Sequence, residues 1–136
     1  MFDLSNYDVY IFDCDGVILD SNKLKSEAFR DALAGEPKDK VNDLVNYHKA
    51  NGGISRYEKF KYFYEIIHPS KDKAAKCEEA IVRFGQLVFE KLQVVDYIPG
   101  VEDFLNSSQS LSKDSFVNSG GDQKELRALF SKRKIS

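Results

Sequence analysis

The sequence predicts an α/β fold in which two parallel strands are separated by an inserted block of helices. Three observations support it: a short apolar strand near the N-terminus, helical periodicity over residues 22–95, and a second strand with a helix close behind it. Because two strands joined through helices normally run in the same direction, we expect the pair to be parallel.

The first strand is predicted over Tyr7–Phe12, where β-branched and aromatic residues follow one another. The run lacks polar–apolar alternation after Asp8, which is typical of a strand covered on both faces, as in a parallel sheet. Asp13-Cys14-Asp15-Gly16 follows it and is expected to form a loop.

The block after this loop carries apolar residues at the spacing of amphipathic helices. One such stripe is formed by Phe60, Phe63, Tyr64 and Ile67, which indicates that the aromatic residues here are core rather than a base-stacking platform. Turn-forming residues such as Gly52-Gly53 interrupt the periodicity. We predict four helices, over residues 22–34, 38–50, 56–67 and 71–92.

The rest of the chain continues with a helix, a strand and a helix. Pro99-Gly100 opens the first helix, Ser115–Asn118 is the strand, and the last helix runs to about Lys132. Asp122, followed three residues later by Glu125, predicts a capping box at the start of that last helix.

Composition argues against several classes of function. A chain of 136 residues fits one domain with a core, and its net charge of -2 provides no basic surface for nucleic acid or an anionic membrane. Its apolar runs are far shorter than the roughly 20 residues that span a bilayer. With only Cys14 and Cys77 and no signal pattern at its start, the sequence suggests neither a disulfide framework nor secretion. We expect a cytoplasmic protein that binds neither nucleic acid nor membranes.

Polar and glycine residues follow both predicted strands. Asp13 and Asp15 come after the first strand and Ser119-Gly120-Gly121 after the second. Ligands of open α/β sheets bind beyond the carboxyl ends of the strands. Of two close carboxylates, one can stay ionised and attack while the other holds a proton, and a divalent cation relieves their repulsion. By their spacing alone, however, the two acids are equally well explained as ordinary turn residues.

A longer sequence match favours a functional site over ordinary turn residues. Ile11-Phe12-Asp13-Cys14-Asp15-Gly16-Val17-Ile18-Leu19-Asp20-Ser21 closely resembles the first signature motif of haloacid dehalogenase-type hydrolases, and Phe116-Val117-Asn118-Ser119-Gly120-Gly121 resembles the second. The helices between them resemble the family's α-helical cap, and Ile98-Pro99-Gly100-Val101 resembles its return from cap to core. The resemblance implies a partial Rossmann-like core over 1–21 and 96–136, with an inserted cap over 22–95.

The resemblance also implies roles for single residues. Asp13 is the expected nucleophile, which forms an aspartyl-phosphate, and Asp15 is the expected general acid and then base. Ser119, with Gly16 and Gly120, is expected to bind the phosphoryl group. Mg²⁺ is the expected cofactor, held by the Asp13 side chain and the Asp15 carbonyl. The second acid favours a phosphatase over a dehalogenase, and a phosphomutase of the same superfamily is the alternative.

The predicted cap contains candidates for substrate binding. Gly52-Gly53-Ile54-Ser55-Arg56 resembles the cap loop of β-phosphoglucomutase-like members, in which an arginine reaches a substrate phosphate. Arg56, Gly53 and Asn22 are therefore expected to contact a small phosphorylated metabolite. The alternative interpretation of Arg56 is a solvated residue that opens a helix after a glycine turn.

The family's later motifs, a lysine and an acidic pair, lack clear counterparts here. Lys132 and Lys134 lie on the helix after the second motif, and no acidic pair follows Asp122. We therefore expect a truncated form that is weakly active or inactive and binds Mg²⁺ weakly; a non-catalytic module that binds a partner is the alternative. Because two strands leave sheet edges and apolar surface open, we expect a homodimer to cover them.

Overall fold

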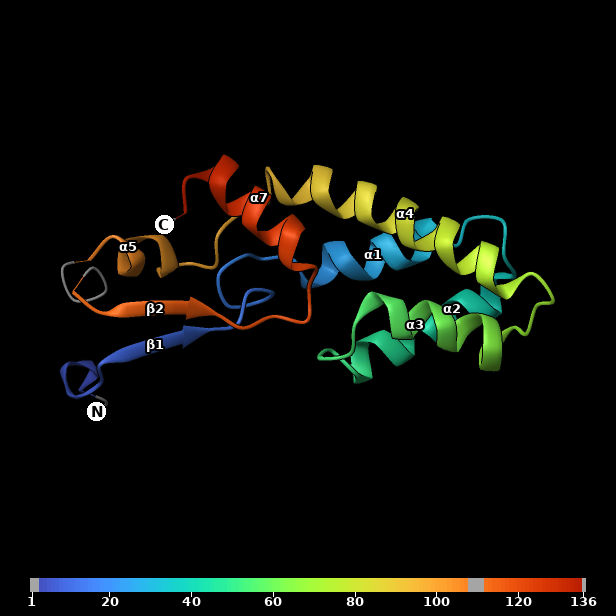
Figure 1. The fold of residues 1–136 in the computed structure, drawn as a ribbon, viewed down its shortest axis with the longest axis horizontal. Helices are drawn as coiled ribbons and strands as arrows, with labels where there is room; N and C mark the ends of the chain where they lie inside the picture. The colour runs from blue at the N-terminus through green and yellow to red at the C-terminus, as the bar shows by residue number, and fades with distance from the viewer. Residues whose placement is uncertain (1–2, 108–111, 136) are drawn as a thin grey trace. The chain divides into compact units, whose positions relative to one another are not determined.

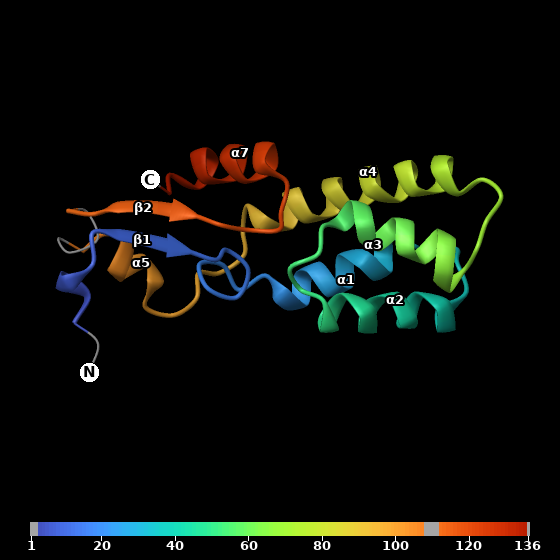
Figure 2. The ribbon, with the colours of Figure 1, turned by 60° about the horizontal axis from the view of Figure 1, so that its bottom comes forward.

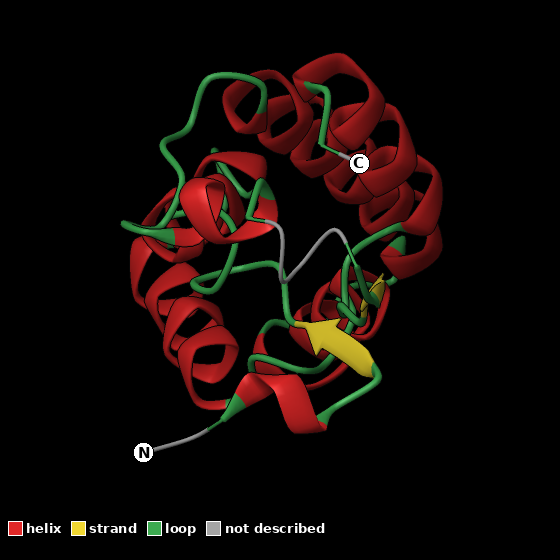
Figure 3. Ribbon diagram, turned by 90° about the vertical axis from the view of Figure 1, so that its left-hand side faces the viewer, coloured by secondary structure: helices red, strands yellow, loops and turns green. Residues whose placement is uncertain are grey.

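The computed structural model describes residues 3–107 and 112–135, which divide into two compact units. The sheet unit comprises Met1–Asn22 and Val95–Ser119, and the helical unit comprises Lys23–Val94 and Gly120–Ser136. Helices make up far more of the described chain than strands do (Figure 3). None of the helices in the described ranges is long and apolar enough to cross a membrane.

The sheet unit contains two strands, β1 (Val9–Phe12) and β2 (Asp114–Val117), which run in parallel (Figure 1). Val9 pairs with Asp114 at one end and Phe12 with Val117 at the other. The α/β fold class and the parallel pairing are thus confirmed. β1 begins two residues later than predicted and β2 one residue earlier.

One face of this strand pair is covered by the short helix α5 (Val101–Leu105), which lies beside it in Figures 1 and 2. The ring of Phe104 lies 5.7 Å from that of Tyr10 and 6.0 Å from that of Phe12, measured between centroids. On the opposite face, the directly paired Ile11 and Phe116 are 68% and 59% exposed. The prediction that the first strand is covered on both faces is therefore wrong, because the described residues supply a cover for only one.

The helical unit begins with the block inserted after β1 (Figure 2). Its elements are α1 (Asn22–Ala32), α2 (Lys38–Ala50), α3 (Arg56–Tyr62), the π-helical turn η2 (Phe63–Ile67) and α4 (Lys73–Leu92). These confirm the four predicted helices, with the third divided between α3 and η2. They enclose a buried aromatic cluster. The ring centroid of Phe29 lies 5.2 Å from that of Phe60 and 4.3 Å from that of Phe84.

The last helix, α7 (Gln123–Arg133), belongs to the helical unit. Its predicted N-cap is confirmed, because the Asp122 carboxylate accepts a hydrogen bond from the Glu125 N–H. Further along, Arg133 donates to the Leu92 carbonyl at 2.8 Å, and the Lys132 ammonium lies 5.2 Å from the centre of the Phe89 ring. These contacts join α7 to α4, whereas the sequence led us to expect residues 120–136 with the core.

Candidate active site

The loop after β1 folds back tightly on itself. The Cys14 carbonyl accepts hydrogen bonds from the amides of Ile18 (2.9 Å) and Leu19 (3.1 Å), and the Gly16 amide donates to the Leu19 carbonyl at 2.8 Å. Gly16 has a φ of +77°, in the left-handed region that glycine adopts without a steric penalty. The glycine of the motif is thus required by the backbone conformation of the turn.

This loop is fixed to the segment that leads into α5. The Asp20 amide donates to the Asp96 carbonyl at 2.9 Å, and the Ile98 amide donates to the Ile18 carbonyl at 3.0 Å. The side chain of Ile18 is buried, as are those of Cys14 and Leu19. Residues from two distant parts of the sequence therefore hold the acidic loop in place, which is the preorganisation that a site for chemistry needs.

The two acids of the loop lie in different environments. Asp13 is exposed, and its carboxylate accepts a hydrogen bond from the Cys14 amide at 2.7 Å. Asp15 is half-buried, and its Oδ1 accepts a hydrogen bond from the Ser21 hydroxyl at 2.5 Å. Ser21 itself is fully buried. Ser21 ends the motif on which the resemblance rests, yet its contact with Asp15 was not foreseen.

Ser119 lies two residues after the end of β2, and Asp13 follows β1 directly. The strand pairing continues past β2, because the Asn118 amide donates to the Phe12 carbonyl at 2.8 Å. Neighbouring strands of a sheet lie about 4.8 Å apart, so both residues emerge at the same edge of the strand pair. Continued past the strand ends, the register places Asn118 next to Asp13 and Ser119 one residue further on. The expected role of Asp13 and Ser119 in one site stays a prediction.

Asn22, which we expected to contact substrate, packs against the acidic loop. A β-carbon placed on Gly16 would collide with the Asn22 side-chain amide. The two residues are therefore close neighbours within the sheet unit, and glycine at position 16 leaves the room that the Asn22 side chain occupies.

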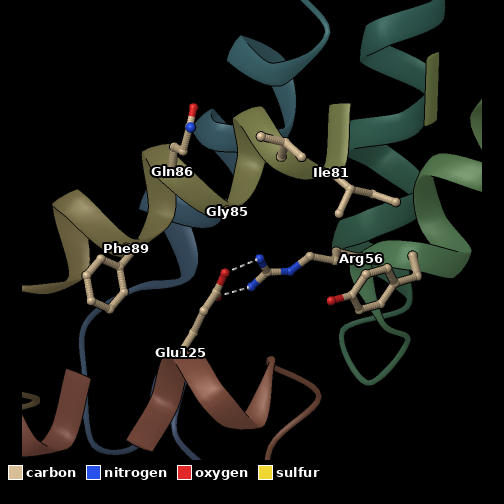
Figure 4. Close-up of a pocket in the computed structure, with 8 residues that line it drawn as sticks. Arg56, Ile81, Gly85, Gln86, Phe89 and Glu125 are labelled. Carbon is tan, nitrogen blue, oxygen red and sulfur yellow. Dashed lines mark hydrogen bonds and ion pairs between the residues drawn. The ribbon is translucent and has the colours of Figure 1, made fainter. Parts of the chain in front are cut away.

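The other candidates lie in the helical unit. A β-carbon on Gly120 would lie 3.2 Å from the Gly53 carbonyl oxygen, so these two backbones approach closely. Arg56 is only 8% exposed, so its interpretation as a solvated residue is wrong. Its guanidinium forms two hydrogen bonds with the Glu125 carboxylate, at 2.8 and 2.6 Å (Figure 4). Sequence reasoning identified Glu125 only as a helix-capping residue.

A second contact from the start of α3 to the start of α7 lies next to this ion pair. The Tyr57 hydroxyl donates to the Asp122 carboxylate at 3.0 Å. This hydrogen bond raises the pKa of Tyr57 above its ordinary value. The pKa of Asp122 is lowered, chiefly because the Glu125 N–H donates to its carboxylate. Both shifts favour a neutral tyrosine that donates to an ionised aspartate.

The oxygen atoms of the acidic loop are suitable ligands for a hard cation. Carboxylate and carbonyl oxygens are the ligands that Mg²⁺ prefers, so the Asp13 side chain and the Asp15 carbonyl fit it chemically. Within residues 3–107 and 112–135, no three His, Cys, Asp or Glu side chains gather closely enough to hold a metal ion.

The fold and the site together define a class: α/β proteins with an acidic loop after the first strand and helices inserted behind it. A model of the haloacid dehalogenase-like hydrolase family matches residues 10–136, and the chain belongs to this family. The family resemblance predicted from the two motifs is confirmed. No curated protein matches the chain closely.

Proposed function

We propose that the chain acts as a phosphatase, transferring the phosphoryl group of a small phosphorylated metabolite first to Asp13 and then to water. The observation that carries this proposal is the unequal placement of the two acids on one fixed loop. Asp13 is exposed at the strand end, whereas Oδ1 of Asp15 is held by the buried Ser21. An accessible nucleophile beside a positioned acid is the pair that two-step phosphoryl transfer uses.

In the first step a carboxylate oxygen of Asp13 attacks phosphorus, and the bond from phosphorus to the substrate oxygen breaks. Asp15, protonated at this stage, gives its proton to the departing alcohol. In the second step Asp15 accepts a proton from the attacking water, phosphate leaves, and the Asp13 carboxylate is restored. The Ser119 hydroxyl would supply a donor for the phosphoryl oxygens. Gly16 would contribute by shaping the turn, since its amide already donates to the Leu19 carbonyl.

Mg²⁺, when bound, would neutralise part of the phosphate charge. Asp13 and the Asp15 carbonyl would hold it, and water would fill its remaining positions. Because these are few protein ligands, we expect weak Mg²⁺ binding and slow turnover by this chain.

The proposal is tested by hydrolysis of an aryl phosphate with and without Mg²⁺. We expect slow hydrolysis that depends on Mg²⁺ and is lost in Asp13→Asn. The matched control is Asp8→Asn, which changes an exposed aspartate just before the other end of β1 and should leave the rate unchanged. Hydrolysis that continues in Asp13→Asn would show that another group is the nucleophile.

A further inference from the structure

The guanidinium of Arg56 is held rigidly within the helical unit. Its Cζ lies 4.7 Å from the centre of the Phe84 ring, and the side chain is 7% exposed. A buried, stacked guanidinium with two parallel donors is preorganised for a planar carboxylate or for two oxygens of a phosphate. The residue therefore has the properties of an anion receptor.

This receptor is already filled by Glu125, which lies 69 residues further along the chain. Gly85 of α4 makes room for the pair. A β-carbon at that position would lie 3.0 Å from Glu125 Oε1 and 3.3 Å from Arg56 Nη1. The ion pair thus lies directly against the α4 backbone, as Figure 4 shows.

The pair is accessible from the Glu125 side. The Glu125 side chain is 28% exposed, four times as much as that of Arg56. Both line an open groove of about 400 Å³, together with Tyr57, Gln86 and Phe89. A dissolved anion entering this groove would meet the carboxylate first and would have to replace it to reach the arginine.

The Glu125 carboxylate has an alternative hydrogen-bond partner. In a complete capping box the glutamate at this position accepts a hydrogen bond from the backbone N–H of the N-cap residue, here Asp122. The structure contains the other half of the box, from the Glu125 N–H to the Asp122 carboxylate, while both Glu125 oxygens bond to Arg56. A rotation of this side chain would complete the cap and uncover the guanidinium.

We propose that Glu125 is an internal competitor for the anion site on Arg56, so that α7 masks this site until an anion displaces the carboxylate. The anion is a small oxyanion that offers two oxygens to the guanidinium, and inorganic phosphate serves as its probe; this proposal does not depend on the proposed function. Because the masked form must open before it binds, the pair lowers the apparent affinity of Arg56 for phosphate.

The experiment is a calorimetric titration of the full chain with inorganic phosphate. We expect Glu125→Gln, which keeps the side-chain shape and removes its charge, to bind phosphate about tenfold more tightly than the wild type. Adding Arg56→Met should abolish this gain in affinity, because it removes the guanidinium that binds the phosphate. Phosphate binding elsewhere on the chain should be unaffected. The control Glu78→Gln, at an exposed glutamate on α4, should leave the affinity unchanged.

Equal affinities in the wild type and Glu125→Gln would overturn the proposal, as would a gain that persists after Arg56→Met. Circular dichroism establishes that each variant is folded. If Glu125→Gln does not fold, Glu125→Asp replaces it, because the shorter carboxylate cannot reach both guanidinium nitrogens and should also tighten phosphate binding. Repeating the titrations in an Asp13→Asn background separates the two proposals. The tighter phosphate binding of Glu125→Gln, and its loss on adding Arg56→Met, should remain even if Asp13 is never phosphorylated.

Discussion

The side-chain amide of Asn22 occupies the space into which a β-carbon on residue 16 would project. Gly16 is also in the left-handed region, with φ at +77°. Two independent requirements, one for the backbone angle and one for space, therefore fall on the same glycine of the acidic loop.

We predict that Gly16→Ala destabilises the sheet unit more than Gly100→Ala does. Gly100 has a φ of +87° but open space around it, so alanine there bears only the backbone cost of about 1–2 kcal/mol. The collision with Asn22 should add about 1 kcal/mol or more at position 16. Hydrogen exchange of the Asn118 amide, which bonds to Phe12 across the strand pair, measures the opening free energy.

The double variant Gly16→Ala/Asn22→Ala should lose this additional cost and keep the backbone cost. Equal destabilisation by Gly16→Ala and Gly100→Ala would mean that Asn22 moves aside freely, which would contradict the close packing described for the loop.

Ser21→Ala should destabilise the acidic loop by about 1–2 kcal/mol, because it removes the buried hydroxyl that donates a hydrogen bond to Oδ1 of Asp15. Ser5 offers a matched comparison, since its hydroxyl donates to the Asp3 carboxylate at 2.6 Å in an exposed position. Water can replace that bond, so Ser5→Ala should change little. Hydrogen exchange of the Asn118 amide again measures the destabilisation. Similar effects of the two substitutions would argue against a positioning role for Ser21.

Asp122 should make the helical unit sensitive to acid. Its pKa is lowered in the folded chain, first by the Glu125 N–H, so its ionised form stabilises the fold above the ordinary pKa of 3.8. That contribution is lost as the pH falls through the lowered pKa. Asparagine is an equally good N-cap but does not ionise, so Asp122→Asn should retain the helix without this pH dependence.

Urea unfolding followed by circular dichroism tests this between about pH 5 and pH 2. As the pH is lowered across that range, the free energy of unfolding of the wild type should fall relative to that of Asp122→Asn. A difference that is independent of pH would contradict the assignment.

The exposed pair of Ile11 and Phe116 predicts self-association, for which we propose a homodimer through the uncovered face of the sheet unit. Light scattering should detect a dimer or larger species in the wild type and a monomer in Ile11→Lys. Ile66→Lys is the control, because Ile66 is similarly exposed, at 63%, but lies in the helical unit. A wild type that stays monomeric would contradict the proposal.

Local patterns in the sequence predicted local structure well. The three-and-four spacing of apolar residues located all four helices of the inserted block, and Asp122 was correctly identified as an N-cap. Both depend on interactions within a few residues along the chain, which a sequence displays directly.

Features that depend on distant contacts were not predictable in the same way. The capping-box pattern places the Glu125 side chain at its own helix start, but a buried arginine 69 residues earlier holds the carboxylate instead. A bidentate, partly buried ion pair outweighs one exposed capping bond. The same contact helps to explain why α7 joins the helical unit, which no local pattern in residues 120–136 reveals.

The central claim, that Asp13 is the nucleophile, is tested most directly by mass spectrometry of the chain after incubation with an aryl phosphate and Mg²⁺. Asp15→Asn is the variant of choice, because without the base of the second step the covalent intermediate should accumulate once a leaving group that needs no proton is used. We predict one added phosphoryl group, mapped to Asp13, labile to hydroxylamine and missing from Asp13→Asn/Asp15→Asn. A chain that remains unmodified, or a phosphoryl group on any other residue, would contradict the account.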